Sequence, residues 1–217
     1  MTKKARLPIN WFIIALIVFY YILGFVLYPH LPESVPSHWN TAGEVDGYMS
    51  KLTHVLFLPS LTLCIYLFMS FAPVIDPKPQ NYRKFMGVFE KFRVFMVFFL
   101  GVLYISTLLF ALGYPVSIGK VVRVTIGVML IFVGNYFGKI RYNFTFGVKT
   151  PWTLANEEVW NKTHRVSGPL WVASGFVWIL SVFLSEKMAF WISMGTLIAV
   201  SLFGTIYSYI IFRRTQS

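Results

Sequence analysis

The sequence is poor in charged residues, above all in acidic ones, and it has one cysteine. Only 12% of the 217 residues are charged and eight are Asp or Glu, whereas 57% are hydrophobic. So few charges cannot cover the surface of a water-soluble globule of this length, which excludes a soluble fold and predicts an integral membrane protein. The lone Cys64 also excludes an intrachain disulfide and a metal site built from several cysteines.

Long apolar runs take the place of the missing charges. A helix needs about 20 apolar residues to cross the hydrocarbon core of a bilayer. Six stretches reach or approach this length: 9–27, 55–75, 94–112, 121–137, 169–184 and 189–212. The fourth is short, and we expect Lys120 and Arg123 to extend outward from it toward the membrane surface. The predicted fold is an all-α integral membrane protein with six transmembrane helices.

Lys and Arg gather in alternate connecting segments. The N-terminal tail has three, 76–93 has five, 139–165 has five and 213–214 has two, against only Lys51, Lys120, Arg123 and Lys187 elsewhere. This bias predicts that both termini are cytoplasmic, and it assigns the net charge of +11 to the membrane surface and not to direct nucleic acid binding. Basic residues before an apolar run also occur in signal peptides, but this run is long and aromatic, which favours an uncleaved anchor.

The connecting segments divide the chain into two regions. Residues 1–75 hold the first helix pair and an extracellular loop, 28–53, and residues 76–217 hold four helices and a cytoplasmic loop, 138–168. The connections 113–119 and 185–188 are short, which predicts antiparallel helix pairs. At the start of the second region, Phe85, Phe89 and Phe92 accompany basic residues, and we expect this segment to lie against anionic lipid before the third helix.

The extracellular loop combines prolines, glycines and polar side chains. Its prolines impose extended backbone, and Gly43 and Gly47 allow turns, so the loop is predicted to be a compact lid. The candidate ligand-binding residues are Pro36, His38, Trp39, Asn40, Gly43, Asp46 and Gly47. Two alternatives stay open: Trp39 and Tyr48 only pack on the helix ends, or the loop binds metal, although its His spacing matches no zinc pattern and no metal ligand is assigned.

The cytoplasmic loop is the longest polar passage. Residues 141–150 alternate weakly and fit an extended segment or a hairpin that turns at Gly147. Pro151 excludes helical backbone at Thr150. Asn156 is a good N-cap, followed by two glutamates, and predicts a short helix over 157–167 with Trp160 and His164 on one face and a joint at 168–169.

Many hydrogen-bonding side chains crowd this loop, which predicts a partner-binding site. Its candidate residues are Arg141, Asn143, Gly147, Lys149, Thr150, Pro151, Trp152, Thr153, Trp160, Lys162, Thr163, His164 and Arg165. The alternative is simple membrane contact, in which Trp152 and Trp160 bury the helix on the bilayer surface while Lys162 and Arg165 meet phosphates. Lipid contact alone does not require so many different hydrogen-bonding groups.

The segment GNYFGKIRYNFTFGVKTPWTLANEEVWNKTHRVSG resembles the signature of the SdpI family of bacterial membrane immunity proteins. The family's R-T-P-W-T-L motif reads here from Lys149 to Leu154, with Lys149 in place of Arg. Lysine cannot bind a carboxylate bidentately as arginine does, so a partner contact made by the family's arginine would differ here. The outer segment YPHLPESVPSHWNTAGEVDGYMSK resembles the domain of unknown function that commonly precedes that signature.

The resemblance implies a multi-pass protein that protects cells from a secreted killing peptide and, once the peptide is bound, holds a DNA-binding repressor at the membrane. We therefore expect a non-enzymatic immunity and signalling protein of the bacterial plasma membrane, without a cofactor, whose partners are the bilayer, an extracellular toxin peptide and a cytoplasmic repressor. The alternatives are a transporter for small solutes or peptides and a structural membrane protein. No Asp, Glu or His falls within the six apolar stretches, which argues against a coupled carrier, and the spacing from Gly134 to Gly138 hints at close helix packing.

Overall fold

The computed structural model describes residues 9–216, and six long helices make up most of this part of the chain. They are α1 (Trp11–Leu27), α2 (Lys51–Ile75), α4 (Met86–Ala111), α5 (Ile118–Phe137), α7 (Glu157–Leu180) and α8 (Glu186–Gln216). All six are long and apolar enough to cross a membrane, which confirms the predicted fold class. The basic residues of the N-terminal tail lie outside the described residues.

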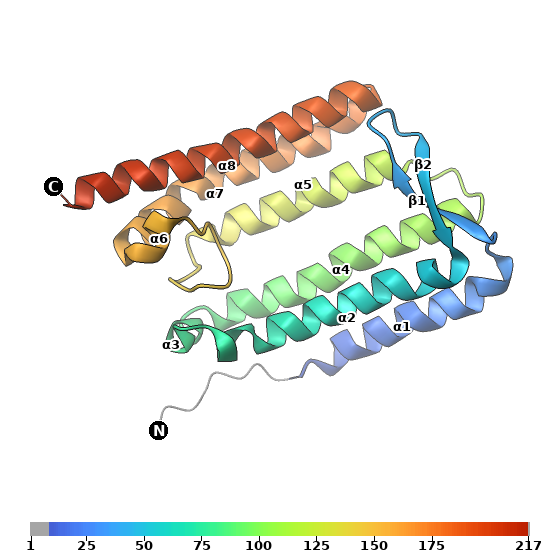
Figure 1. The fold of residues 1–217 in the computed structure, drawn as a ribbon, viewed down its shortest axis with the longest axis horizontal. Coiled ribbons are helices and arrows are strands. Elements are labelled where there is room, and N and C mark those ends of the chain that lie inside the picture. Colours follow the sequence, from blue (N-terminus) through green and yellow to red (C-terminus); the bar gives the residue numbers. More distant parts are fainter. Residues whose placement is uncertain (1–8, 217) are drawn as a thin grey trace.

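The helices form two halves of three (Figure 1). Helices α1, α2 and α4 pack together on one side, α5, α7 and α8 pack together on the other, and contacts between α4 and α5 join the halves. Short connections link α4 to α5 and, through the 3-10 turn Ser181–Phe183, α7 to α8, so both pairs are antiparallel as predicted. Helix α1 begins and α8 ends at the same end of the bundle. Which side of the membrane that end faces stays a prediction, as does the division of the chain at residue 76.

The predicted lid between α1 and α2 is a β-hairpin. A 3-10 turn (Tyr28–His30) leads into β1 (Ser34–Trp39), which pairs antiparallel with β2 (Val45–Ser50). Gly43 makes the turn with a φ of 82°, a conformation that L side chains rarely adopt. Gly47 instead stands within β2, opposite His38, so its predicted role in the turn was wrong. The hairpin spans the end of the bundle from α2 toward the start of α8 (Figure 1).

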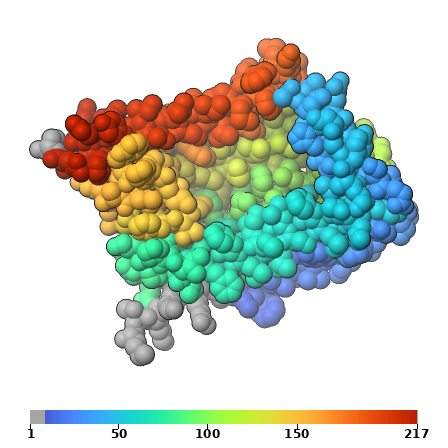
Figure 2. Space-filling model, viewed as in Figure 1, coloured from blue at the N-terminus to red at the C-terminus, as the bar shows by residue number. Residues whose placement is uncertain are grey.

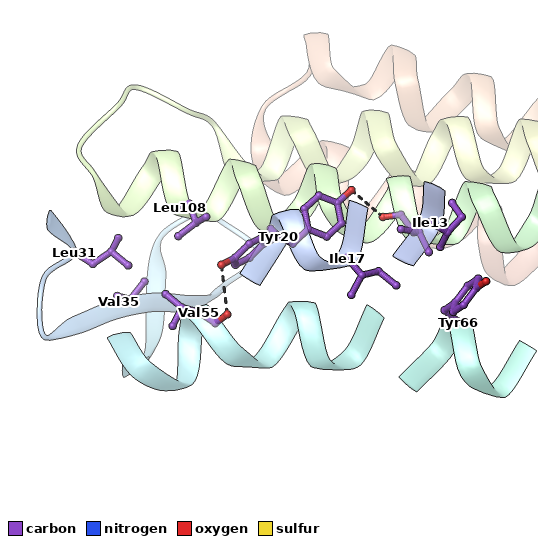
Figure 3. Close-up of a cluster of buried hydrophobic side chains, with 10 residues drawn as sticks. Ile13, Ile17, Tyr20, Leu31, Val35, Val55, Tyr66 and Leu108 are labelled. Atoms are coloured by element: carbon purple, nitrogen blue, oxygen red, sulfur yellow. Dashed lines mark hydrogen bonds between the residues drawn. The ribbon is translucent and has the colours of Figure 1, made fainter. Parts of the chain in front are cut away.

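An apolar cluster holds the hairpin to the first half (Figure 3). Ile17 and Tyr20 from α1 meet Val55 from α2 and Leu108 from α4, and Val35 of β1 joins them with no exposed surface. For Val35, which lies outside the membrane-spanning helices, this burial is worth roughly 2 kcal/mol. The base of the hairpin is therefore fixed by packing, while its turn extends over the second half.

A second cluster lies at the opposite end of the bundle and includes the segment predicted to lie against lipid. After the short helix α3 (Pro79–Tyr82), Phe85, Phe89 and Phe92 are each at most 3% exposed. The cytoplasmic loop covers them, and the Phe92 ring packs edge-on against Phe146 at 4.4 Å. The predicted lipid contact of these three rings was wrong, because a distant segment competes for the same apolar surface.

Helices α5 and α7 touch backbone to backbone at two levels. A Cβ on Gly134 would lie 2.6 Å from the Gly168 carbonyl oxygen, and one on Gly127 would lie 2.7 Å from that of Gly175. Gly138 has no such neighbour within 4 Å, so of the predicted Gly134 to Gly138 pair only Gly134 takes part in the close packing. These contacts hold α7 on both sides of Pro169, and the helix runs through it, so the predicted break at 168–169 was wrong.

Candidate functional site

A cavity lies between the two halves beneath the hairpin, and we call it the hairpin cavity. Its volume is about 460 Å³, within the range of ligand sites. Its lining includes Trp39, Asn40 and Gly43 of the hairpin, Leu103 and Thr107 of α4, Ile118, Val122 and Arg123 of α5, Trp178 of α7, and Glu186, Phe190 and Met194 of α8. In the space-filling view the molecule is hollowed between α2 and α8, and the hairpin bounds one end of the hollow (Figure 2).

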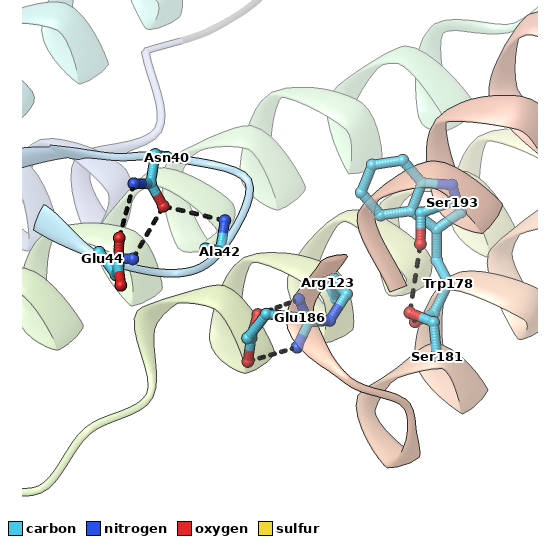
Figure 4. Close-up of polar contacts among 8 residues, drawn as sticks. All are labelled: Asn40, Ala42, Glu44, Arg123, Trp178, Ser181, Glu186 and Ser193. Carbon is cyan, nitrogen blue, oxygen red and sulfur yellow. Dashed lines mark hydrogen bonds and ion pairs between the residues drawn. The ribbon is translucent and has the colours of Figure 1, made fainter. Parts of the chain in front are cut away.

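The predicted outer residues shape the hairpin more than they line the cavity. Asn40 accepts hydrogen bonds from the backbone N–H groups of Ala42 and Glu44 at 2.9 and 3.1 Å, which fixes the turn (Figure 4). His38 and Asp46 pair across the strands with 2.5 Å between His38 Nδ1 and Asp46 Oδ1. His38, Trp39, Asn40 and Gly43 border the cavity, whereas Pro36, Asp46 and Gly47 are not among its lining residues.

The two aromatic residues predicted to pack on the helix ends behave differently. The Trp39 ring stands edge-on to Phe110 of α4 at 5.5 Å, as expected for a ring that anchors the hairpin. Tyr48 on β2 is 61% exposed, so that prediction was wrong for Tyr48. The strand alternation explains the difference, since Tyr48 lies on the outward face of β2.

An ion pair joins α5 to α8 at the mouth of the hairpin cavity (Figure 4). Arg123 Nη1 and Nη2 donate to the two carboxylate oxygens of Glu186 at 2.6 and 3.0 Å. The hairpin turn lies over this pair, since a Cβ on Gly43 would be 3.1 Å from Glu186 Cγ. Arg123 is 6% exposed, so the prediction that it extends outward was wrong. A bidentate ion pair is stronger where water is excluded than in bulk water, and this pair favours the inward conformation of the Arg123 side chain.

Two buried donors in the wall of the hairpin cavity have no acceptor within the described part of the protein. They are Arg123 Nε and Trp178 Nε1. Trp178 is 5% exposed and stands beside Ser193, which donates to Ser181 at 3.2 Å (Figure 4). Neither side chain was among the site residues predicted from the sequence. An arginine in one apolar stretch and a glutamate that begins another were the available signal, because charges in membrane helices usually pair.

At the other end of the bundle, the cytoplasmic loop folds around the indole of Trp160. This ring has no exposed surface, donates from Nε1 to the Ile140 carbonyl at 3.0 Å, and stacks on the His164 ring at 4.1 Å. His164 Nε2 accepts from the Val148 N–H at 2.9 Å, so its proton is on Nδ1, which donates to the Trp160 carbonyl. The predicted shared face of Trp160 and His164 is confirmed.

Gly147 allows the loop to pass close to these two rings. Its φ is 126°, and a Cβ there would lie 2.5 Å from His164 Nε2. Residues 141–150 form no hairpin and no continuous extended segment, the two arrangements that were predicted, because bends held by side chains take their place. The buried Asn143 holds one such bend by accepting from the N–H groups of Thr145 and Phe146 at 2.9 and 2.7 Å.

A carboxylate from the end of α2 completes the fold of this loop. Asp76 is 4% exposed and accepts hydrogen bonds from the Phe144 N–H at 2.8 Å and the Thr145 hydroxyl at 2.7 Å. The Tyr82 hydroxyl also donates to Asp76, and burial raises the pKa of the Tyr82 phenol, so it stays protonated. The sequence analysis had treated Asp76 only as the start of a connecting segment.

The remaining predicted loop residues divide into buried and exposed sets. Thr150 caps the short helix α6 (Pro151–Ala155) through a reciprocal pair with Thr153, and its hydroxyl lies 2.9 Å from that of Ser208 on α8. Asn156 caps α7 as predicted. Among the predicted partner-binding residues, Asn143, Thr150, Thr153, Trp160, Thr163 and His164 are buried, while Arg141, Lys149, Pro151, Lys162 and Arg165 are exposed and Trp152 is half-buried beside Tyr209. Partner binding by this loop stays a prediction.

A second cavity, the loop cavity, lies between the cytoplasmic loop and the second half. It measures about 440 Å³ and is lined by residues 145–150 together with Val133, Phe137, Trp171, Val200, Ser201, Gly204 and Thr205. Helix α7 contributes to both cavities, with Trp178 at one and Trp171 at the other. One continuous helix thus lines both cavities.

The bundle also contains a buried charge that the sequence analysis did not expect. Arg93 in α4 has no exposed surface, lies 2.8 Å from Glu90 and stacks over the Tyr66 ring at 4.7 Å. The expectation that no acidic residue falls within the helices was based on a third stretch that began at residue 94. Helix α4 begins at Met86, so Glu90 and Arg93 both belong to it.

Six apolar helices in two halves, with a hairpin from the first half across one end, define a multi-pass protein of the cell membrane. Comparison with known proteins narrows this class. Residues 139–208 match the SdpI/YfhL protein family, and residues 15–63 match a domain of unknown function, DUF1648. The chain is 28% identical over 190 residues to "Immunity protein SdpI" of Bacillus subtilis (strain 168), covering 87% of this chain and 88% of that protein. The predicted resemblance to the SdpI family and its N-terminal domain is confirmed. No solved structure matches the chain significantly.

Proposed function

We propose that this chain is a membrane immunity protein that binds an apolar antimicrobial peptide at the hairpin cavity and thereby protects the cell that carries it. One observation carries the proposal: an apolar cavity between two helical halves that is covered by a β-hairpin and contains an ion pair. The similarity to a protein named for immunity, over 87% of the chain, supports the same function. Such a site suits recognition, so we propose that the chain acts by binding and not as an enzyme.

We further propose that occupation of the hairpin cavity is signalled to the cytoplasmic loop, which then retains a transcriptional repressor. Helix α7 offers the mechanical link, since it carries Trp178 in one cavity and the stacked Trp160 and His164 at the other end. Pro169 stands between them and removes one backbone hydrogen bond, which makes this level of the helix the easiest to bend. The exposed Lys149 and Arg165 are suited to contact an acidic surface of the repressor.

The immunity function is tested by survival. A strain that lacks this protein should be more sensitive than wild type to a membrane-active peptide made by its own species or its neighbours. Trp39→Ala should weaken protection, since it removes the ring that anchors the hairpin. Trp152→Ala should change transcription on peptide exposure more than it changes survival. Equal survival of deletion and wild-type strains across a panel of such peptides would reject the proposal.

A second candidate function, transport of a small solute or peptide, is favoured by the buried Arg93 and its half-buried partner Glu90 in α4. Ionisable groups inside membrane helices often mark a transport pathway. This alternative predicts uptake of a labelled peptide into membrane vesicles under an imposed proton gradient, with loss of uptake in Glu90→Gln. Uptake that does not depend on the protein would exclude it.

A further inference from the structure

We infer that the hairpin cavity takes an uncharged, apolar stretch of extended peptide, whose backbone carbonyl oxygens accept hydrogen bonds from Arg123 Nε and Trp178 Nε1. The inference rests on the proposed function and names the chemistry of the ligand at that site. It also assigns Arg123 and Trp178, which lie outside the predicted site residues, as the groups that recognise the peptide.

Two donors in the cavity wall, Arg123 Nε and Trp178 Nε1, have no acceptor among the described residues. Both side chains are more than nine-tenths buried and line the same cavity. A buried donor without a partner lowers stability, and a ligand in the cavity that supplies an acceptor would remove this cost. No buried side-chain oxygen of the described cavity wall is similarly unpaired. The ligand must therefore supply acceptors and needs no donor.

The charge of the site favours a neutral acceptor over a carboxylate. Arg123 already donates from both terminal nitrogens to Glu186, so the pair as a whole is neutral. A ligand carboxylate beside Arg123 Nε would also meet the Glu186 carboxylate, and a ligand ammonium would meet the guanidinium. A peptide carbonyl avoids both repulsions and still receives a charge-assisted hydrogen bond.

The strand that borders the cavity favours a peptide over a lipid. Ser37, His38 and Trp39 of β1 line the cavity, whereas no residue of β2 does. Within the described residues the sheet has two strands, so β1 pairs with β2 alone. A strand with one unpaired edge can add an extended peptide through main-chain hydrogen bonds, which a fatty acyl chain cannot offer.

The test uses photo-cross-linking to the full-length protein in membranes. The probe is an N-acetylated, C-amidated tetrapeptide of sequence Val-Bpa-Leu-Val, in which Bpa is p-benzoylphenylalanine. A photoreactive lauric acid serves as the lipid arm. The variants are Trp178→Phe, which removes Nε1–H and keeps an aromatic ring, and Arg123→Lys, which keeps the positive charge and removes Nε–H. Trp191→Phe is the matched control, since Trp191 is 62% exposed on the outside of α8.

We expect the tetrapeptide concentration for half-maximal cross-linking to rise about tenfold in Trp178→Phe and Arg123→Lys and to stay unchanged in Trp191→Phe. Without the probe, Trp178→Phe should unfold at the same temperature as the wild type or higher, because an unpaired donor is removed. A residue with only a packing role would instead lose stability. This second measurement keeps the inference testable if Arg123→Lys fails to fold.

Unchanged tetrapeptide cross-linking in both variants would overturn the inference. The inference would also be overturned if only the cross-linking of lauric acid depended on the two donors, because the cavity would then be a lipid site. Equal survival of deletion and wild-type strains, with donor-dependent tetrapeptide cross-linking intact, would reject the proposed function and leave this inference standing. Protection that survives in Trp178→Phe, together with unchanged cross-linking, would reject this inference alone.

Discussion

Asp76 shows how one side chain can hold a loop that carries no regular structure. It accepts hydrogen bonds from the backbone of Lys78 and Phe144 and from the hydroxyls of Tyr82 and Thr145. In Asp76→Ala these donors lose a buried acceptor, and we expect the free energy of unfolding of the purified protein to fall by about 3 kcal/mol. Chemical denaturation in detergent, followed by the fluorescence of the seven tryptophans, measures the loss.

The control for Asp76 is another acidic residue of the same end, Glu158. Its ion pair with Lys162 at 2.7 Å is on the surface, where such pairs contribute about 0.5 kcal/mol or less. Glu158→Ala should therefore be close to wild type. Equal destabilisation by the two variants would mean that Asp76 is not the acceptor that orders the loop.

The residues whose local roles were predicted correctly from the sequence are those whose partners lie near them in the chain. Asn156 and the non-helical Thr150 follow from capping and proline rules, which act over three or four residues. Asp76 and Arg123 escaped prediction because the partners that define their roles, the Phe144 N–H and Glu186, lie more than 60 residues away. No local pattern distinguishes an arginine that reaches the membrane surface from one that turns inward to pair with Glu186.

At the scale of elements, the glycine contacts between α5 and α7 set the distance between the two helices. Any side chain at Gly134 would meet the carbonyl of Gly168, so Gly134→Ala must separate the helices or shift their backbones. We expect a loss of about 2–3 kcal/mol in stability and less folded protein in the membrane. Gly138→Ala, four residues along at the end of the same helix, has open space and should be tolerated. Similar amounts of folded Gly134→Ala and Gly138→Ala, by fluorescence-detected size-exclusion chromatography, would contradict the close packing.

Hydropathy predicts the six helices because a membrane span needs a longer apolar run than soluble helices or strands usually contain. It does not predict the hairpin strands, since β1 contains Pro36 and is held by Val35 in a core supplied by three helices. It also placed a break at Pro169 that the structure lacks. Whether a proline ends a helix depends on neighbouring packing, here the contacts of Gly168 and Gly175 with α5.

In the molecule as a whole, positive charge is concentrated at the end of the bundle that carries the cytoplasmic loop, opposite the hairpin. Twelve of the described Lys and Arg residues belong to 76–93, 139–165 and 213–214, at the end that carries the cytoplasmic loop, and four lie toward the hairpin end. The positive-inside rule then places the hairpin cavity outside the cell, where a secreted peptide would arrive. The proposed function depends on this orientation, since a hairpin that faced the cytoplasm could not meet such a peptide first.

Single cysteines test the orientation directly, in a Cys64→Ser background. Ala42 is exposed at the hairpin turn and Ala155 is exposed at the end of α6, so cysteine at either position should cost little stability. In intact cells a membrane-impermeant maleimide should label Ala42→Cys and leave Ala155→Cys unlabelled until the membrane is opened. Because an odd number of spans separates the two positions, labelling of both in intact cells would contradict the six-helix topology, and labelling of Ala155→Cys alone would invert it. In the inverted case the charged loop, with Lys149 and Arg165 on its surface, would face the outside, and the hairpin cavity could no longer be the first contact of an extracellular peptide.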